Sequence, residues 1–424
     1  MKTLFPSIAS FLLLFVFGLT SIAVTAQESE GVFVISGVVK DQKSKRALEY
    51  VNVTVPGSNV GTITNSDGFF SLKIKKNKNT PFIEISHIGY QTSRLPIGQE
   101  NIDEKVLFLS PGIIRLNEVV IKPVDARQVI DQALSAIRVN YNRYPAMHKG
   151  FYRETSQKKR KYITISEAVI DVYKTAYTEN VDKDRVRIFK GRQLLSQRQG
   201  DTLAVKLIGG PTLATFLDMV KNPDVLLSRD CLDYYKYEFT EYAMIDNRMH
   251  YTIRFSPQVV TDDPLYTGTL YIDRENFAIT RLEFNLDMRD KMKVTRMILR
   301  HKPAGLMFKP VSISYLVTYR QQEGRTYLNY IRNEIKFNAD WKKKWFSTTY
   351  TVTSEMVITD RQDNPPGSIP YKETFKSTQV LSDKVMNFYD ENFWEDYNII
   401  EPTESLDNAV KKLKKTQGQA LSLK

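Results

Sequence analysis

The chain has 424 residues, 42% of them hydrophobic, and a formal net charge of +12. At roughly 100 to 200 residues per domain, this length predicts two or three domains with enough apolar residues for a core in each. The single cysteine, Cys231, excludes an internal disulfide, and the basic charge favours anionic surfaces such as phosphate-bearing lipids or acidic glycans.

The start of the chain is typical of a secretory signal peptide. Lys2 precedes the apolar run of residues 11–17, and small residues lead up to Ala26. We therefore expect residues 1–26 to be removed and the mature protein to be exported, in the periplasm or associated with the outer membrane. The apolar run is too short for a retained anchor, and no later segment has the length and apolarity of a transmembrane helix. Export argues against nucleic acid as a partner.

Residues 31–123 are expected to form a small β-sandwich. Asp67 and Gly68 are a turn signal, because Asp tolerates left-handed backbone geometry and Gly adopts a positive φ without steric cost. After the turn, Phe70 and Leu72 alternate with polar residues, which is the period of a strand with one buried face. Similar short runs across this region give about seven strands, the number and spacing of a sandwich.

The same region resembles a known family through a series of short motifs. In chain order these are residues 35–41 (ISGVVKD), 50–53 (YVNV), 61–62 (GT) with 65–70 (NSDGFF), 88–90 (IGY) and 116–120 (LNEVV). The series is similar to the carboxypeptidase-regulatory-like domain. That resemblance implies a transthyretin-like or Ig-like fold, often placed ahead of outer-membrane transporters, and an accessory role without catalytic residues. Asn65 and Asp67 also suit part of a calcium loop, but the other oxygen ligands are missing at the required spacing, which favours a structural turn.

Residues 124–400 are expected to form a larger antiparallel β domain that begins with a helix. Asp125 is suited to cap this helix, whose apolar residues between Val129 and Ile137 fall on one face. Beyond it, long runs alternate between apolar and polar residues and are separated by turns. The apolar stripes are Met249, Tyr251, Ile253 and Phe255; Leu282, Phe284 and Leu286; Val311, Ile313, Tyr315, Val317 and Tyr319; and Tyr350, Val352, Met356 and Ile358.

These one-faced strands predict a mainly β protein whose second domain is a curved antiparallel sheet with a few helices, one of them over residues 212–220. The alternation is also typical of transmembrane β-barrels, but the many charges on the polar faces favour a sheet that shelters its apolar face. The hairpin of residues 268–281 is similar to hairpins of lipoprotein-carrier-like domains, which implies a half barrel with a hydrophobic cavity. The whole arrangement also resembles uncharacterised envelope proteins of Gram-negative bacteria, and residues 389–402 are typical of them.

Residues 401–424 are expected to form a basic C-terminal helix or tail. Leu406, Ala409, Val410 and Leu413 lie at helical spacing, with lysines between them. Such a helix either rests on an anionic membrane surface or presents a solvated face. Two further basic clusters, at residues 158–161 and 341–345, sit where strands should turn. The candidate contacts with anionic lipid are Lys342, Lys343, Lys344, Lys411, Lys412, Lys414 and Lys415.

The sequence lacks the residue patterns of common catalytic sites. None of its four histidines belongs to an H-x-x-E or H-E-x-x-H motif, and no G-x-S-x-G elbow, Walker loop or dinucleotide fingerprint occurs. We therefore expect a non-catalytic envelope protein without metal or cofactor. Its first predicted role is to bind or assemble a lipid, lipoprotein or hydrophobic partner at the outer membrane. The alternative is a structural protein–protein interaction module, and a hydrolase built from converging Asp and Glu pairs is the third.

Overall fold

The computed structural model of the chain describes residues 31–76, 80–112, 124–196, 205–341, 347–387, 394 and 396–422. The predicted signal peptide, the predicted strand of residues 119–121 and the predicted domain boundary at residues 122–123 lie outside the described residues. The described part is mainly β, as the alternation predicts, and its strands form two units.

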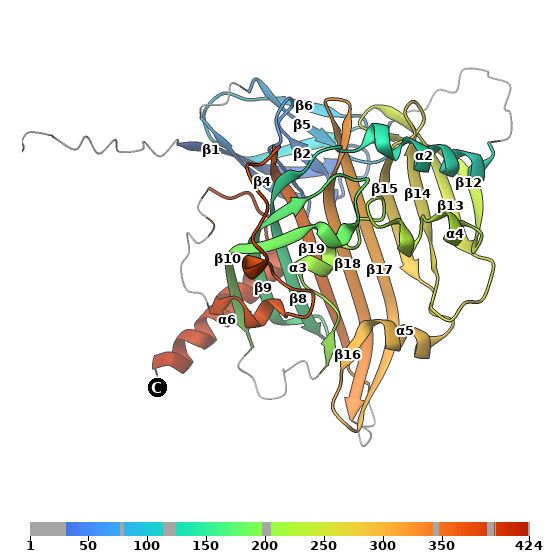
Figure 1. Cartoon of the computed structure of the whole chain (residues 1–424). Helices are drawn as coiled ribbons and strands as arrows, with labels where there is room; N and C mark the ends of the chain where they lie inside the picture. Colours follow the sequence, from blue (N-terminus) through green and yellow to red (C-terminus); the bar gives the residue numbers. More distant parts are fainter. Residues whose placement is uncertain are drawn as a thin grey trace, which may run out of the picture.

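The first unit, which we name the front module, is a sandwich of two small sheets with strand orders β4-β1-β7 and β3-β2-β5-β6 (Figure 1). The predicted seven-stranded sandwich is confirmed. Its strands are β1 (Val32–Asp41), β2 (Asn52–Thr54), β3 (Gly61–Ile63), β4 (Phe69–Lys75), β5 (Phe82–Ser86), β6 (Ser93–Pro96) and β7 (Ile102–Leu109).

The turn before β4 has the geometry that its sequence predicts. Gly68 has a φ of +75°, and a Cβ there would lie 2.7 Å from the carbonyl oxygen of Val39, so only glycine fits without strain. The Asn65 side-chain oxygen accepts hydrogen bonds from the backbone N–H groups of Asp67 (2.9 Å) and Phe69 (3.0 Å). Asn65 therefore shapes this turn, and Phe70 begins the buried face of β4.

The second unit is a sheet of eleven strands in the order β12-β13-β14-β15-β17-β18-β19-β8-β9-β10-β20, which we name the large sheet. Neighbours pair antiparallel, except for the short parallel pair of β10 and β20. Its strands are β8 (Ala146–Lys158), β9 (Lys161–Lys174), β10 (Arg185–Leu195), β12 (Tyr235–Ile245), β13 (Arg248–Pro257), β14 (Tyr266–Asp273), β15 (Ile279–Leu286), β17 (Leu306–Gln322), β18 (Arg325–Trp341), β19 (Thr349–Asp363) and β20 (Met386–Asn387). A separate pair joins β11 (Lys206–Leu207) to β16 (Leu299–His301).

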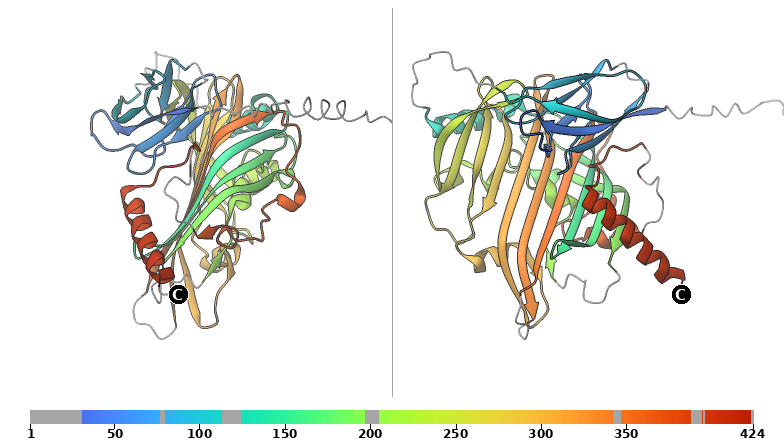
Figure 2. Two further views of the ribbon diagram at one scale, coloured as in Figure 1. Left: turned by 90° about the vertical axis from the view of Figure 1, so that its left-hand side faces the viewer. Right: turned by 180° about the vertical axis from the view of Figure 1, so that it is seen from behind.

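One face of the large sheet carries most of the predicted apolar stripes and is covered by helices, which Figure 2 shows on one side of the sheet. Val311 is an exception, because β17 has a bulge between Pro310 and Ser312 and the Val311 side chain is exposed. The covering helices are α2 (Ala126–Asn140), α3 (Pro211–Thr215), α4 (Arg229–Leu232) and α5 (Lys291–Ile298). Ile253, Leu282 and Val317 of the stripes are fully buried beneath this cover. The prediction of one-faced strands is therefore confirmed, and the apolar face is filled largely by the chain's own side chains.

Two of the covering helices bear on the sequence prediction. Asp125 caps α2, its carboxylate accepting from the N–H groups of Arg127 (3.0 Å) and Gln128 (3.1 Å), and the predicted apolar face of α2 packs on the sheet. The helix expected over residues 212–220 ends at Thr215 instead. The chain then turns so that Asp218 points into the core, where it meets Lys174.

The opposite face of the large sheet lies against the front module and the C-terminal segment, as the edge-on view in Figure 2 shows. Helix α6 (Glu404–Ser422) packs Leu406, Val410 and Leu413 against Ile165 and Leu194 of β9 and β10. The predicted C-terminal helix is thus present, and its apolar side is occupied by the sheet.

Candidate functional site

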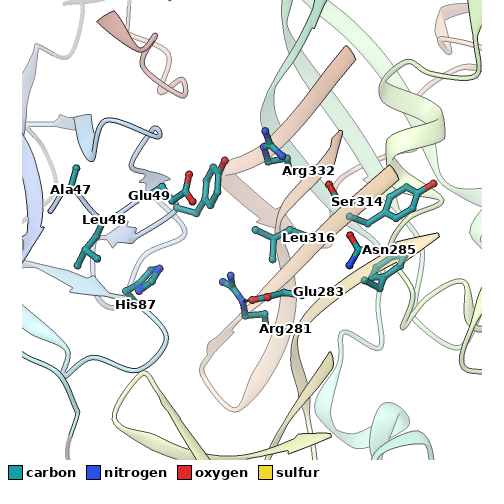
Figure 3. A pocket seen from close by; sticks show the side chains of 13 residues that line it. Ala47, Leu48, Glu49, His87, Arg281, Glu283, Asn285, Ser314, Leu316 and Arg332 are labelled. Atoms are coloured by element: carbon teal, nitrogen blue, oxygen red, sulfur yellow. Dashed lines mark hydrogen bonds and ion pairs between the residues drawn. The ribbon is translucent and has the colours of Figure 1, made fainter. Parts of the chain in front are cut away.

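A pocket of about 510 Å³ lies where the front module meets the large sheet. Figure 3 shows its two walls, with Leu48, Glu49 and His87 of the front module facing Arg281 and Glu283 of the sheet. We name it the interdomain pocket. Its lining residues are Ala47, Leu48, Glu49, Tyr50, His87, Arg281, Glu283, Phe284, Asn285, Ser314, Tyr315, Leu316 and Arg332.

The sheet wall follows from strand alternation. Arg281, Glu283 and Asn285 are alternate residues of β15, so their side chains share the face opposite the buried Leu282 and Phe284. The neighbouring strands β17 and β18 add Ser314, Leu316 and Arg332 in the same way. The polar faces that the sequence left without a role are therefore the surface that meets the front module.

The charged groups of the sheet wall are paired with one another. Arg281 Nε lies 2.5 Å from Glu283 Oε1, and an Arg332 guanidinium nitrogen lies 2.7 Å from Glu334 Oε2. Tyr50 of the front module stacks on Tyr330 with ring centroids 5.5 Å apart. The wall thus offers fixed charges of both signs beside an aromatic surface, which suits a polar partner with both donors and acceptors.

His87, on the front-module wall, has a strongly shifted pKa. Burial, together with the nearby positive charge of Arg281, lowers the pKa of His87 to about 4. Its Nδ1 is buried and has no hydrogen-bond partner among the described residues. His87 is therefore neutral at physiological pH.

A second pocket, of about 210 Å³, adjoins the first, sharing Glu49, Tyr50 and Arg332 with it. Its far side is formed by the C-terminal segment, through Ile400, Glu401, Thr403 and Leu406. The two pockets together form a groove between the front module and the sheet, and the C-terminal segment lies at one end of that groove.

The lysines expected to contact anionic lipid are only partly placed. Lys342, Lys343 and Lys344 lie outside the described residues. Lys411, Lys412 and Lys415 are exposed on α6, Lys414 is half-buried, and Lys411 Nζ pairs with Asp407 at 2.7 Å. The structure therefore places four of the seven on the outer side of one helix, away from the interdomain pocket.

The remaining residues that sequence reasoning considered lie elsewhere. Cys231 sits half-exposed in α4, with its Sγ 3.6 Å from the carbonyl oxygen of Asp224. Asp67, considered for calcium, uses a carboxylate oxygen to accept from the N–H of Glu404 (2.8 Å). Over residues 31–422, apart from the gaps given above, no group of three His, Cys, Asp or Glu side chains could hold a metal ion.

Sequence reasoning did not find the interdomain pocket. Glu49 and Arg281 are more than 200 positions apart, and each reads as an ordinary exposed polar residue of a strand or turn. The one available signal was the unusual number of charged residues on the polar faces of β15 and β18. No local pattern shows that another unit of the same chain covers those faces.

The front module is a carboxypeptidase-regulatory-like domain: residues 35–121 match the family model described as CarboxypepD_reg-like domain, which confirms the resemblance. A curated relative is the TonB-dependent receptor SusC of Bacteroides thetaiotaomicron, 31% identical over 93 residues. That match covers 20% of this chain and 9% of the receptor, so the similarity spans only a small part of the receptor's length.

Solved structures similar to this chain include a LolA superfamily protein from Nitrosomonas europaea, with 11% sequence identity and a TM-score of 0.23. That match covers 60% of this chain and 100% of the other. A DUF1329 family protein from Desulfovibrio piger has 11% identity, 57% and 95% coverage, and a TM-score of 0.23. No helix among the described residues is both long and apolar enough to cross a membrane.

Proposed function

We propose that this chain is a non-catalytic binding and assembly module of the cell envelope, and that it engages a protein partner at the interdomain pocket. The observation that carries the proposal is the pocket itself, because two units of the chain jointly build a surface that combines apolar side chains with fixed charges of both signs. The partial similarity of the front module to a TonB-dependent receptor supports export and a place in the envelope.

A catalytic role has little support from the groups at the pocket. Glu283 is ion-paired with an arginine, and so is Glu334 beside the pocket, so each carboxylate already has a charged partner. Burial opposes ionisation of Glu334, but hydrogen bonds from Lys336 and Arg332 lower its pKa, which makes it a poor proton donor. His87 Nδ1 has no hydrogen-bond partner among the described residues, so it activates no hydroxyl or thiol through that nitrogen. The pocket therefore supports recognition better than acid–base or nucleophilic chemistry.

A lipid, lipoprotein or other hydrophobic ligand is the second candidate. The apolar face of the sheet is buried under helices, so a ligand there would have to displace them. A smaller pocket of about 220 Å³ beside α5 is a candidate entry site for such a ligand, because Leu265 lines this pocket and packs against the buried core. Val260 and Met292, two apolar residues near the pocket, are 89% and 78% exposed. Native mass spectrometry of protein extracted from membranes, with repeated absence of bound lipid, would contradict this candidate.

Contact with anionic lipid is a further part of the proposal. One end of the large sheet carries an exposed basic turn, Lys159, Arg160 and Lys161, together with the exposed Trp341. They share this end because the N–H of Lys159 donates to the carbonyl oxygen of Thr349 at the start of β19, and β19 pairs with β18, the strand that ends at Trp341. Indole and basic side chains together suit a membrane interface. Lys411, Lys412, Lys414 and Lys415 of α6 would add to this charge.

Site-specific photo-crosslinking in cells tests the protein partner. A photoreactive residue at Asn285, exposed in the pocket, should give a discrete adduct, whereas one at Glu238, exposed on β12, should not. The additional substitution Ser314→Arg, which fills the pocket, should abolish the adduct. Equal adducts at both positions, or an adduct that survives Ser314→Arg, would contradict a partner at the interdomain pocket.

A further inference from the structure

The C-terminal segment of residues 396–413 runs from the front module onto the large sheet, where α6 lies along the sheet, as the two views in Figure 2 show from the side and from behind. We name it the clasp. The clasp contacts both units through described residues, and these contacts connect the clasp to a wall of the interdomain pocket.

The front module holds the clasp through its β3–β4 region. Thr62 Oγ1 donates to the carbonyl oxygen of Ile399 at 3.0 Å, and Asn65 Nδ2 donates to that of Pro402 at 2.9 Å. The Asp67 carboxylate accepts from the N–H of Glu404, in the first turn of α6. The side chain of Asn398 exchanges two hydrogen bonds with the backbone of Lys73, at 2.7 and 3.0 Å.

The large sheet holds the other side of the clasp. An Arg153 guanidinium nitrogen donates to the carbonyl oxygen of Ile400 at 2.7 Å, while Arg153 Nε pairs with Glu167, also at 2.7 Å. Ile399 and Ile400 are buried in one cluster with Ile63 of the front module. The same cluster contains Val169, Val357 and Trp394. The clasp is therefore an apolar wedge and a set of hydrogen bonds shared by both units.

The two units also contact each other directly. Asn59 Nδ2 donates to the carbonyl oxygen of Arg361 at 2.7 Å, and Asn329 Nδ2 to Asn52 Oδ1 at 2.9 Å. On another side, the N–H of Gly89 donates to the carbonyl oxygen of Met244 at 2.7 Å. Further direct contacts lie at β3 itself, because Ile63 is buried in one cluster with Tyr330 and Val357 of the large sheet and Tyr50 stacks on Tyr330. The clasp therefore adds a further attachment at the β3–β4 region.

A short chain of hydrogen bonds links the clasp to the pocket. Thr64 is the neighbour of Asn65, whose side chain bonds to the clasp. The Oγ1 of Thr64 donates to the carbonyl oxygen of Leu48 at 2.7 Å. The N–H of Tyr50 donates to the carbonyl oxygen of Thr64 at 3.1 Å. Leu48 and Tyr50 line the interdomain pocket, so the position of this wall depends on the turn that the clasp grips.

We propose that the clasp sets the width of the interdomain pocket by fixing the β3–β4 region of the front module to the large sheet, and that release of the clasp lets the front module tilt. Interfaces between domains of one chain commonly permit such relative motion unless they are large and apolar. The use of this motion in partner binding rests on the proposed function, whereas the motion itself does not.

Distance measurement between spin labels on the two units tests the clasp. The labels are placed at Lys43→Cys in the front module and Lys309→Cys in the large sheet, both exposed, in a chain whose native cysteine is replaced by Cys231→Ser. The double variant Thr62→Val, Asp67→Ala removes two grips of the clasp. We expect a broader or shifted distance distribution for this variant, with an unchanged far-ultraviolet circular dichroism spectrum.

The matched control, Asp407→Ala with Lys411→Ala, breaks an exposed ion pair within α6 and should keep the distance distribution of the parent chain. Ile400→Ala, which weakens the apolar wedge, should act like the double variant. An unchanged, narrow distribution in both clasp variants, or equal broadening in the control, would overturn the proposal. No partner enters this measurement, so its failure leaves the proposed function standing, and failure of crosslinking at Asn285 leaves the clasp standing.

Discussion

Asp218→Asn should strongly destabilise the cover over the apolar face of the large sheet. The Asp218 side chain is fully buried and lies 2.8 Å from Lys174 Nζ, 2.7 Å from the hydroxyl of Tyr319 and 3.0 Å from that of Tyr177. Lys174 also pairs with Asp184 at 3.2 Å. Burial opposes both ionised forms, but the opposite charges prevail, raising the pKa of Lys174 and lowering that of Asp218.

The size of the effect follows from the charge balance of this cluster. Lys221 Nζ, 2.9 Å from Asp184, supplies a second positive charge, so two lysines balance two aspartates. Asp218→Asn leaves one buried positive charge uncompensated, and breaking a buried pair in this way costs about 3 to 5 kcal/mol. An asparagine keeps the shape and an acceptor oxygen, so the loss measures charge more than packing.

Urea unfolding followed by tryptophan fluorescence should show this loss as a lower midpoint for Asp218→Asn. Adding Lys174→Met removes the stranded charge and should recover a large part of the stability, with coupling between the two substitutions. A loss below about 1 kcal/mol in the single variant, or no recovery in the double variant, would refute the reasoning. It would also mean that the cover over the apolar face is weakly held.

Three further predictions concern single side chains. Burial raises the pKa of Glu154, so its folded-state pKa exceeds its unfolded value and its contribution to stability is lost as pH rises through the folded pKa. Glu154→Gln should therefore raise the midpoint of thermal unfolding at pH 8 more than at pH 4. An equal change at both pH values would contradict this prediction. Gly68→Ala places a Cβ at positive φ against Val39 and should cost about 1 to 3 kcal/mol in urea unfolding. Asp125→Ala removes the α2 cap and should cost about 1 kcal/mol in the same assay, with Asp131→Ala, exposed on α2, as a near-neutral control.

Local patterns in the sequence predicted much of the fold. The turn at Gly68, the cap at Asp125 and the alternation through Ile253 and Val317 all depend on neighbours within a few residues, which the sequence displays directly. The early end of α3 was missed because Asp218 is drawn into the core by Lys174, a residue 44 positions away. Its carboxylate gave no local sign of that partner.

The candidate site could not be predicted for the same reason on a larger scale. Thr62 and Ile399, which join the clasp to the front module, are 337 positions apart. Each is unremarkable in its own segment, a polar residue in a short strand and an apolar residue in a tail. Loop closure over such separations is decided by the packing of the whole chain, so sequence reasoning found the two units and missed the surface between them.

The two sides of the large sheet are held by interactions of different strength, and this difference ranks the candidate functions. On the helix-covered side, the ion cluster of Lys174 and Asp218 makes opening costly, because a buried charge would be stranded. On the front-module side, Thr62 and Asn398 hold the clasp through neutral hydrogen bonds, each worth about 1 kcal/mol net. The bonds of Asp67 and Arg153 to the clasp involve a charged group, but their partners are backbone groups, so opening there strands no ion pair. Motion that admits a partner should therefore occur first at the interdomain pocket, which favours a protein partner there over a lipid beneath the helices.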